Sequence, residues 1–287
     1  MIPKARSAHH RGSEGVIPTF LIIGAMRSGT TSVARQLGQH PEVFIAPQKE
    51  VHFFDLNWER GMGWYERQFQ SANGEPAVGE ASPSYLHDAR AIERIAKTLP
   101  EARLIALLRD PVSRAYSHYW HNRARGREDL SFEEAIAAEP DRISGLGWDT
   151  GRKFAYLGRG RYATQLQRVD DHFDRSALRV LLFEEYRADP ASVLADLFRF
   201  AGVDPSFTPP DPAAALNGFV TFRSVHVRNA TRRLPPLLRD GIGRLNVTRG
   251  SYPPMDPETR AMLKERFAED NARLAARLGR SLEVWER

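Results

Sequence analysis

The chain has 287 residues, no cysteine and a formal net charge of +5, with an isoelectric point near 9.6. Without a Gly/Ser/Pro-rich linker, we expect one domain over residues 17–287 after a disordered tail, residues 1–16. The missing cysteines exclude disulfides, thiolate catalysis and a Cys-based zinc site. No apolar run approaches the ~18 residues of a membrane span, and the N-terminus lacks the apolar segment of a secretory signal. The positive charge suits a polyanionic ligand without requiring one.

Apolar runs of strand length alternate with helical patterns along the chain. The predicted strands cover residues 20–24, 43–46, 77–80, 103–108 and 178–183. The predicted helices cover residues 30–39, 63–69, 88–98, 161–173, 190–201 and 257–278, together with a helix that begins at Pro111. This alternation predicts an α/β fold with three layers, α/β/α, around a central, mostly parallel sheet. In such sheets, ligands bind at the carboxyl ends of the strands.

Several residues mark the expected helix ends. Asp88 and Asp110 precede helices as N-caps, and Pro111 suits the first helical position because an N–H there would have no helical partner. Gly202 and Gly279 follow the last residues of two predicted helices and are expected to end them.

The first predicted strand runs into a P-loop-like segment, a candidate phosphate-binding loop, with the sequence FLIIGAMRSGTTS over residues 20–32. Gly24 and Gly29 have the spacing of the ATPase loop G-x-x-x-x-G-K-[ST], but Thr30 replaces its lysine and Arg27 is the only cation. In such a loop, backbone N–H groups and a helix N-terminus face an anion. The missing lysine suggests a nucleotide whose reacting bond is not the β–γ phosphoanhydride. An ordinary strand–turn–helix is the alternative.

A second candidate cluster follows the predicted strand over residues 103–108. Arg109 stands at the strand end, where a Mg²⁺-binding ATPase would carry a carboxylate, and Ser117 lies about two turns into the next helix. Asp110, Arg114 and Ser117 share a helix face by their spacing. An arginine fork and a hydroxyl on one side of a crevice suit a second phosphate. The alternative is that Arg109 merely pairs with Asp110 or with a helix end.

A third candidate cluster is the segment QKEVHFFD over residues 48–55. In an extended chain, Glu50, His52 and Phe54 would point to one side. A carboxylate and an imidazole side by side, just past a short strand, are a candidate base and its partner. The alternative is a solvated strand edge that carries two polar residues.

Together these segments resemble the sulfotransferases that use 3′-phosphoadenosine 5′-phosphosulfate (PAPS). The 5′-phosphosulfate loop of that family, with the Lys-Glu-x-His-Phe-Phe segment of its glycan enzymes, is similar to FLIIGAMRSGTTSVARQLGQHPEVFIAPQKEVHFFD. The 3′-phosphate segment is similar to LIALLRDPVSRAYSHYWH, and further landmarks are VGEASPSYL, GRGRYATQL, FEEYRADP and RGSYPPMD. The resemblance covers nearly the whole chain and is strongest to the heparan-sulfate-type enzymes and their bacterial relatives.

The resemblance implies an enzyme that moves the sulfuryl group of PAPS to an acceptor hydroxyl or amine by in-line transfer. Glu50 would be the general base, and His52 would contact the acceptor and the sulfuryl group. Arg27 would neutralise the leaving 5′-phosphate and the bridging oxygen. PAPS is then the co-substrate. No metal is required, because the sulfuryl group carries less charge than a γ-phosphate.

The resemblance also assigns contacts to the nucleotide. Loop residues would supply N–H and hydroxyl donors, Arg109 and Ser117 would hold the 3′-phosphate, and a C-terminal loop would close over the nucleotide. The expected nucleotide-binding residues are Arg27, Ser28, Gly29, Thr30, Thr31, Arg109, Ser117, Arg249, Gly250 and Ser251.

Three departures from the family pattern matter. Ala81 stands where a lysine commonly follows the glutamate of the family's Glu-Lys-[Ser/Thr]-Pro segment, so acceptor contacts should differ. The C-terminal loop often reads Lys-Gly-Arg, whereas this chain has Arg249, Gly250 and Ser251, with one cation fewer. The cysteine pair of many Golgi members is absent. With the missing anchor, this absence predicts a cytoplasmic enzyme of bacterial type.

The acceptor is not identified by these motifs, and we expect a saccharide or a small metabolite. Residues 223–249 carry seven arginines against one acid, Asp240, and would attract an anionic acceptor if they rim its cleft. Alternatively, they form a solvated linker whose arginine stems cover apolar surface. We expect no nucleic-acid polymer and no membrane span. A small-molecule P-loop kinase and a non-catalytic polyanion-binding module are the competing function classes.

Overall fold

The computed structural model describes residues 15–210, 220–222, 247–249 and 252–286. Its centre is a five-stranded sheet in the order β2-β3-β1-β4-β5, in which every pair is parallel. A separate antiparallel pair joins β6 to β7. The strands are β1 (Phe20–Gly24), β2 (Val43–Ile45), β3 (Ala77–Ala81), β4 (Arg103–Leu108), β5 (Leu178–Leu182), β6 (Val220–Phe222) and β7 (Val247–Arg249). The five predicted strands form the central sheet.

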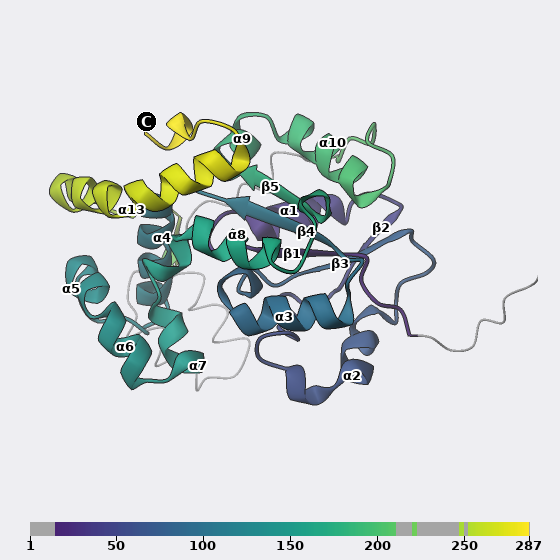
Figure 1. Ribbon diagram of the computed structural model, residues 1–287, viewed down its shortest axis with the longest axis horizontal. Coiled ribbons are helices and arrows are strands. Elements are labelled where there is room, and N and C mark those ends of the chain that lie inside the picture. The colour runs from purple at the N-terminus through teal and green to yellow at the C-terminus, as the bar shows by residue number, and fades with distance from the viewer. Residues whose placement is uncertain (1–14, 211–219, 223–246, 250–251, 287) are drawn as a thin grey trace, which may run out of the picture.

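Helices cover both faces of this sheet (Figure 1), with α1 and α10 packed on one face and α3 and α8 on the other. The predicted three-layer α/β/α fold is therefore confirmed. The helices of the described residues are α1 (Thr30–Leu37), α2 (Met62–Glu66), α3 (Ala89–Thr98), α4 (Pro111–Ala124), α5 (Phe132–Ala137), α6 (Glu139–Gly145), α7 (Trp148–Gly151), α8 (Tyr162–Asp170), α9 (Phe183–Ala188), α10 (Pro190–Ala201) and α13 (Pro257–Leu278).

The predicted helix ends agree with the structure. The side chain of Asp88 accepts a hydrogen bond from the backbone N–H two residues later, and that of Asp110 from those two and three residues later. Gly202 (φ 84°) and Gly279 (φ 63°) end their helices in the left-handed conformation that glycine adopts at low cost. Helices α5, α6, α7 and α9 were not predicted. The first of them begins at a capping box from Ser131, a signal that was present in the sequence.

The central strand β1 positions the candidate site. All five of its residues are buried, with alternate side chains in the two helical layers. Gly24, at its end, is in register with Ala106 of β4. Parallel strands place their carboxyl ends at one edge of the sheet. The segment after β1 and Arg109 after β4 therefore open onto the same edge.

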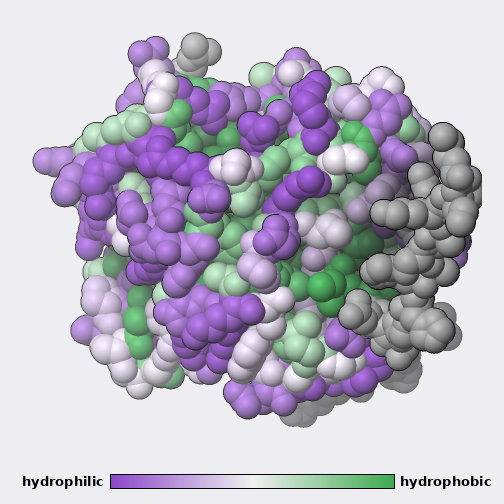
Figure 2. Space-filling model, turned by 45° about the vertical axis from the view of Figure 1, so that its right-hand side comes forward, coloured by the Kyte–Doolittle hydropathy of each residue, from purple (hydrophilic) through white to green (hydrophobic). Residues whose placement is uncertain are grey.

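The surface is predominantly polar on the side shown in Figure 2, where hydrophobic residues gather toward the middle of the face. Among the described residues, the exposed large apolar side chains are Val16, Ile17, Leu56, Leu146 and Met262. None of the described helices combines the length and the apolar character needed to cross a membrane.

Candidate active site

The segment over residues 24–30, called here the phosphate loop, turns from β1 into α1. Gly29 has φ 91° at the N-cap position of α1, and a Cβ atom there would lie 2.9 Å from the ring of Phe183. Only glycine satisfies both the backbone conformation and this close contact. Ser28 is fully buried, and its Oγ has no hydrogen-bond partner among the described residues. The loop thus presents a helix N-terminus and an unpaired hydroxyl, as a phosphate cradle requires.

Two basic residues and a serine from separate motifs meet beside this loop. Arg27 Nε donates to Ser117 Oγ at 3.2 Å, and Arg109 Nη1 donates to the backbone oxygen of Arg27 at 3.3 Å. The Arg109 guanidinium also lies 5.1 Å from the centre of the Phe183 ring. Burial, together with nearby cations, lowers the pKa of Arg27 to about 10. The structure therefore gathers two guanidinium groups and a hydroxyl around one small region, a composition that suits a multiply charged anion.

His121, which the motifs did not single out, also holds Arg27. Arg27 Nη1 lies 3.1 Å from His121 Nδ1. Burial and the surrounding cations lower the pKa of His121 to about 3, so the ring is neutral and accepts the guanidinium N–H. His121 and Ser117 lie one helical turn apart on α4, and this spacing lets both contact the same arginine.

The predicted pair of Glu50 and His52 is formed, with 3.3 Å between Glu50 Oε2 and His52 Nε2. The extended backbone under which Glu50, His52 and Phe54 would point to one side is not what the structure shows. Glu50 has φ 55° and His52 has φ 53°, both left-handed, and Phe54 is fully buried in the core. The two polar side chains are thus brought together by a tight, twisted turn rather than by strand alternation.

Asp55 is a third member of this cluster that the sequence analysis missed. Its carboxylate is 3.1 Å from His52 Nδ1, accepts from Ser84 Oγ at 2.6 Å and from Arg152 Nη1 at 3.1 Å. The spacing His-x-x-Asp was visible in the segment HFFD. Arg152, about a hundred residues later, could not be connected to it from sequence.

The charges of this cluster depend on one another. Burial disfavours the ionised form of Asp55, but His52, Ser84 and Arg152 outweigh it and lower the pKa of Asp55 to about 2. Burial also opposes the charge on His52, yet its two carboxylate partners raise the pKa of His52 to about 9. The hydrogen bond from His52 lowers the pKa of Glu50. At neutral pH the cluster is therefore an imidazolium between two carboxylates.

The candidate catalytic residues share an unusual backbone conformation. Among the described residues, the non-glycine residues with positive φ are Arg27 (73°), Glu50 (55°) and His52 (53°). Such conformations cost free energy and persist where the surrounding structure enforces them, often at functional sites. The three residues come from two loops that are distant in sequence, so their shared strain is an independent indication of a functional site.

A cavity of about 390 Å³ opens beside Glu50, between α1 and residues 45–50. Thr31 and Glu50 are among its lining residues, and Arg35 and Lys49 line it as exposed cations. Neither cation forms an ion pair with another described residue. The volume is in the range of small-molecule sites.

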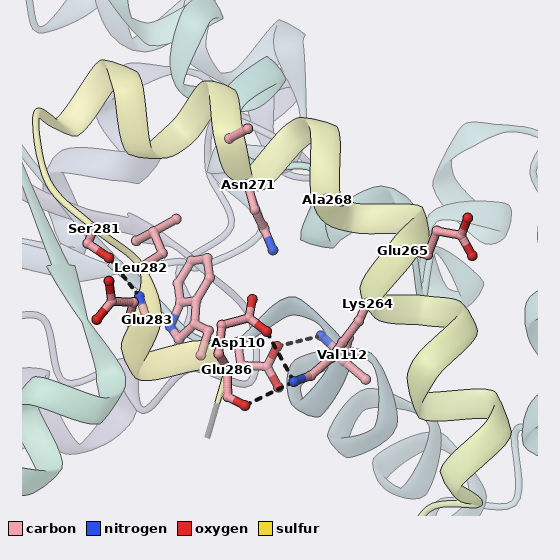
Figure 3. Close-up of a pocket in the computed structure, with 12 residues that line it drawn as sticks. Asp110, Val112, Lys264, Glu265, Ala268, Asn271, Ser281, Leu282, Glu283 and Glu286 are labelled. Carbon is pink, nitrogen blue, oxygen red and sulfur yellow. Dashed lines mark hydrogen bonds and ion pairs between the residues drawn. The ribbon is translucent and has the colours of Figure 1, made fainter.

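A second cavity, of about 450 Å³, lies between the start of α4, α13 and the C-terminal segment (Figure 3). Lys264 Nζ bonds the backbone oxygen and the carboxylate of Glu286 there. Trp285 Nε1 donates to Glu184, whose other oxygen accepts from the backbone N–H of Asp110. These contacts fix Asp110, the residue after Arg109. The cavity is lined by none of the residues predicted to be catalytic or to bind the nucleotide. Within the described part of the chain, no group of three His, Cys, Asp or Glu side chains could hold a metal ion.

Some predicted contacts lie outside the described residues. These are Gly250, Ser251 and residues 223–246, which make up most of the arginine-rich segment. Arg249 lies in β7, where its backbone pairs with Val220. The proposed closing loop and the basic rim of an acceptor cleft therefore stay predictions.

Comparisons with known proteins agree on one family. The family model described as "Sulfotransferase domain" matches residues 18–234. Human bifunctional heparan sulfate N-deacetylase/N-sulfotransferase 3 is 32% identical in an alignment of 289 positions that covers 94% of this chain and 31% of that protein. The mouse bifunctional heparan sulfate N-deacetylase/N-sulfotransferase 4 is 30% identical with the same coverage. This chain thus spans about a third of the length of these curated relatives.

A solved structure extends the similarity to the whole fold. The crystal structure of a sulfotransferase from Alicyclobacillus acidocaldarius has a TM-score of 0.76 and 33% sequence identity. The alignment covers 95% of this chain and 100% of that chain.

Proposed function

The chain belongs to the sulfotransferase family and is a transferase of sulfuryl groups, and we propose that its donor is PAPS. We further propose that its acceptor is a hydroxyl or amine of a saccharide or a small metabolite. Residues 17–287 would form the single catalytic domain. The observation that supports the assignment most strongly is the strained backbone shared by Arg27, Glu50 and His52.

Glu50 is the proposed general base. In-line transfer forms a bond from the acceptor oxygen or nitrogen to sulfur and breaks the bond from sulfur to the 5′-phosphate oxygen. The acceptor proton passes to Glu50, and the electron pair of the broken bond stays on the phosphate. His52, with its pKa raised to about 9 by its two carboxylate partners, holds its proton at neutral pH, and Glu50 is therefore the proposed base. Its role is to hold Glu50 in place and to present positive charge to the sulfuryl oxygens.

Arg27 is the proposed cation at the leaving side. Its guanidinium is held between Ser117 and His121, next to the phosphate loop. A fixed positive charge there stabilises the negative charge that develops on the bridging oxygen. Arg109 and Ser117 would bind the 3′-phosphate, with Ser28, Gly29, Thr30 and Thr31 around the 5′-phosphate. Arg249, Gly250 and Ser251 remain proposed contacts from the C-terminal side.

The cavity beside Glu50 is the proposed acceptor site. Its exposed cations, Arg35 and Lys49, suit an acceptor that carries a carboxylate or sulfate. The names of the curated relatives, heparan sulfate N-deacetylase/N-sulfotransferases, support a saccharide amine as the target group. No metal is proposed for the transfer.

The proposal is tested by transfer of label from [³⁵S]PAPS to a panel of glycans, amines and phenols in the presence of EDTA, with mass identification of the product. We expect a labelled product with EDTA present, and binding of adenosine 3′,5′-bisphosphate in preference to ATP–Mg²⁺. No label transfer from PAPS, together with binding of ATP–Mg²⁺ in preference to the bisphosphate, would instead indicate a P-loop kinase.

A further inference from the structure

Glu80, on β3, is a buried carboxylate that has no place in the proposed chemistry. It is 1% exposed and forms no ion pair in the described part of the chain. Its oxygens accept hydrogen bonds from Ser82 Oγ at 2.6 Å, Tyr85 Oη at 2.8 Å and Tyr65 Oη at 3.1 Å. Burial raises the pKa of Glu80, because three hydroxyl hydrogen bonds only partly offset the loss of water, so a carboxyl group at this position calls for a specific explanation.

Two of these hydroxyls also bind the segment over residues 50–55, called here the base loop. Ser82 Oγ accepts from the backbone N–H of His52 at 3.0 Å. Tyr85 Oη accepts from the backbone N–H of Phe53 at 2.8 Å. Each hydroxyl therefore joins Glu80 on one side to the base loop on the other.

The direction of these hydrogen bonds follows from the donors. The N–H groups of His52 and Phe53 can only donate, so Ser82 and Tyr85 must use their lone pairs toward the loop. Their protons are then directed to Glu80, which accepts at both oxygens. A carboxylate is the side chain that can accept from all three hydroxyls at once.

We propose that Glu80 is a positioning residue for the transfer reaction, because it aligns Ser82 and Tyr85 to hold the left-handed backbone at His52 and thereby fixes the Glu50–His52 pair. This inference rests on the proposed function of Glu50 and His52. Asp55 and Arg152 fix the side chain of His52, whereas Glu80 fixes the backbone of the same loop. Left-handed backbone at two non-glycine residues needs such support to persist.

Tyr65 provides the matched control. Its hydroxyl, like that of Tyr85, is buried and donates to Glu80 Oε1. In contrast to Tyr85, it makes no hydrogen bond to the base loop among the described residues. Tyr65→Phe and Tyr85→Phe therefore remove the same group from the same carboxylate, but only the second also removes the acceptor for Phe53.

The experiment compares Glu80→Gln, Ser82→Ala and Tyr85→Phe with Tyr65→Phe and the wild type. Backbone amide exchange across residues 50–55 reports loop order without any substrate. Calorimetry with adenosine 3′,5′-bisphosphate reports the nucleotide site. Transfer from [³⁵S]PAPS, with N-desulfated heparin as the acceptor probe, reports catalysis.

We expect exchange in the base loop to speed up at least tenfold in Tyr85→Phe, Ser82→Ala and Glu80→Gln, and to stay near wild type in Tyr65→Phe. Turnover should fall about 10- to 100-fold in the first three, since small displacements of a catalytic group cost this much, with bisphosphate affinity within twofold. Equal exchange in Tyr85→Phe and Tyr65→Phe would overturn the inference. A wild type that transfers no sulfuryl group from PAPS would defeat the proposed donor, while the exchange data would still decide the role of Glu80 in loop order.

Discussion

The phosphate loop (residues 24–30) and the base loop (residues 50–55) follow neighbouring parts of the same sheet edge, yet they are held in different ways. The phosphate loop is shaped by its own chain: β1 ends, Gly29 turns left-handed and α1 begins. The base loop is shaped by residues from other parts of the chain. Arg152 donates to Asp55, and Ser82, which is bound to Glu80, accepts from the backbone N–H of His52. The backbone of a local loop can be predicted from its sequence, whereas the backbone of a loop held by distant residues is seen only in the fold.

The largest effect should come from removing the base itself. Glu50→Gln keeps the shape of the side chain and removes its basicity, so turnover should fall by about 10²–10⁴-fold. Affinity for adenosine 3′,5′-bisphosphate, which belongs to the phosphate loop, should stay within about twofold by calorimetry. Near-wild-type turnover with a verified acceptor would move the base elsewhere.

The distant support of the base loop should matter strongly for stability. Arg152→Met removes one of the two cationic partners of the buried Asp55 carboxylate, the other being His52, and should cost up to about 3–5 kcal/mol in free energy of unfolding. The control is Arg199→Met, which removes an exposed cation 3.9 Å from Asp196 and should cost less than about 1 kcal/mol. Urea denaturation measures both. Similar costs for the two variants would contradict the account of a loop held from a distance.

The nucleotide side of the site should respond in binding rather than in stability. Arg109→Ala should weaken the binding free energy of adenosine 3′,5′-bisphosphate by about 1.5–3 kcal/mol, which is the contribution of hydrogen bonds to a charged group. Adenosine 5′-phosphate, which lacks the 3′-phosphate, should bind almost unchanged. If calorimetry shows equal weakening for both ligands, Arg109 has a structural role and the assignment to the 3′-phosphate is wrong.

Two features require glycine at position 29, its left-handed backbone and its close contact with the Phe183 ring. Gly29→Ala adds a Cβ at positive φ and 2.9 Å from the Phe183 ring, so it should cost about 1–3 kcal/mol and weaken nucleotide binding. Gly279→Ala places alanine in a similar left-handed backbone (φ 63°, ψ 28°) with no atom within 4 Å, and should cost about 1 kcal/mol. Thermal unfolding of the pair isolates the contact with Phe183. Equal costs would show that this contact does not limit the loop.

The same contrast explains what the sequence could predict. The strands, the N-caps at Asp88 and Asp110 and the glycine turn at Gly29 depend on residues that are adjacent in the chain, and all were predictable. The meeting of Arg27, Arg109 and Ser117 was expected because parallel strands end at one edge.

The rest depended on tertiary contacts. The left-handed backbone of the base loop was not predicted, because the sequence of this segment cannot report a hydrogen bond from His52 to a serine thirty residues away. The links from Asp55 to Arg152 and from Phe53 to Tyr85 join segments that are far apart in the chain, so neither segment alone predicts them.

The most direct test of the central claim, that Glu50 rather than His52 takes the acceptor proton, is a ¹⁵N NMR titration of the His52 ring in the intact protein. Because its two carboxylate partners raise the pKa of His52 to about 9, the ring should be an imidazolium at pH 7 and lose its proton only as the pH rises through about 9. Turnover should decline over the same range. A His52 ring that is neutral at pH 7 would contradict the account and make His52 the first candidate for the base.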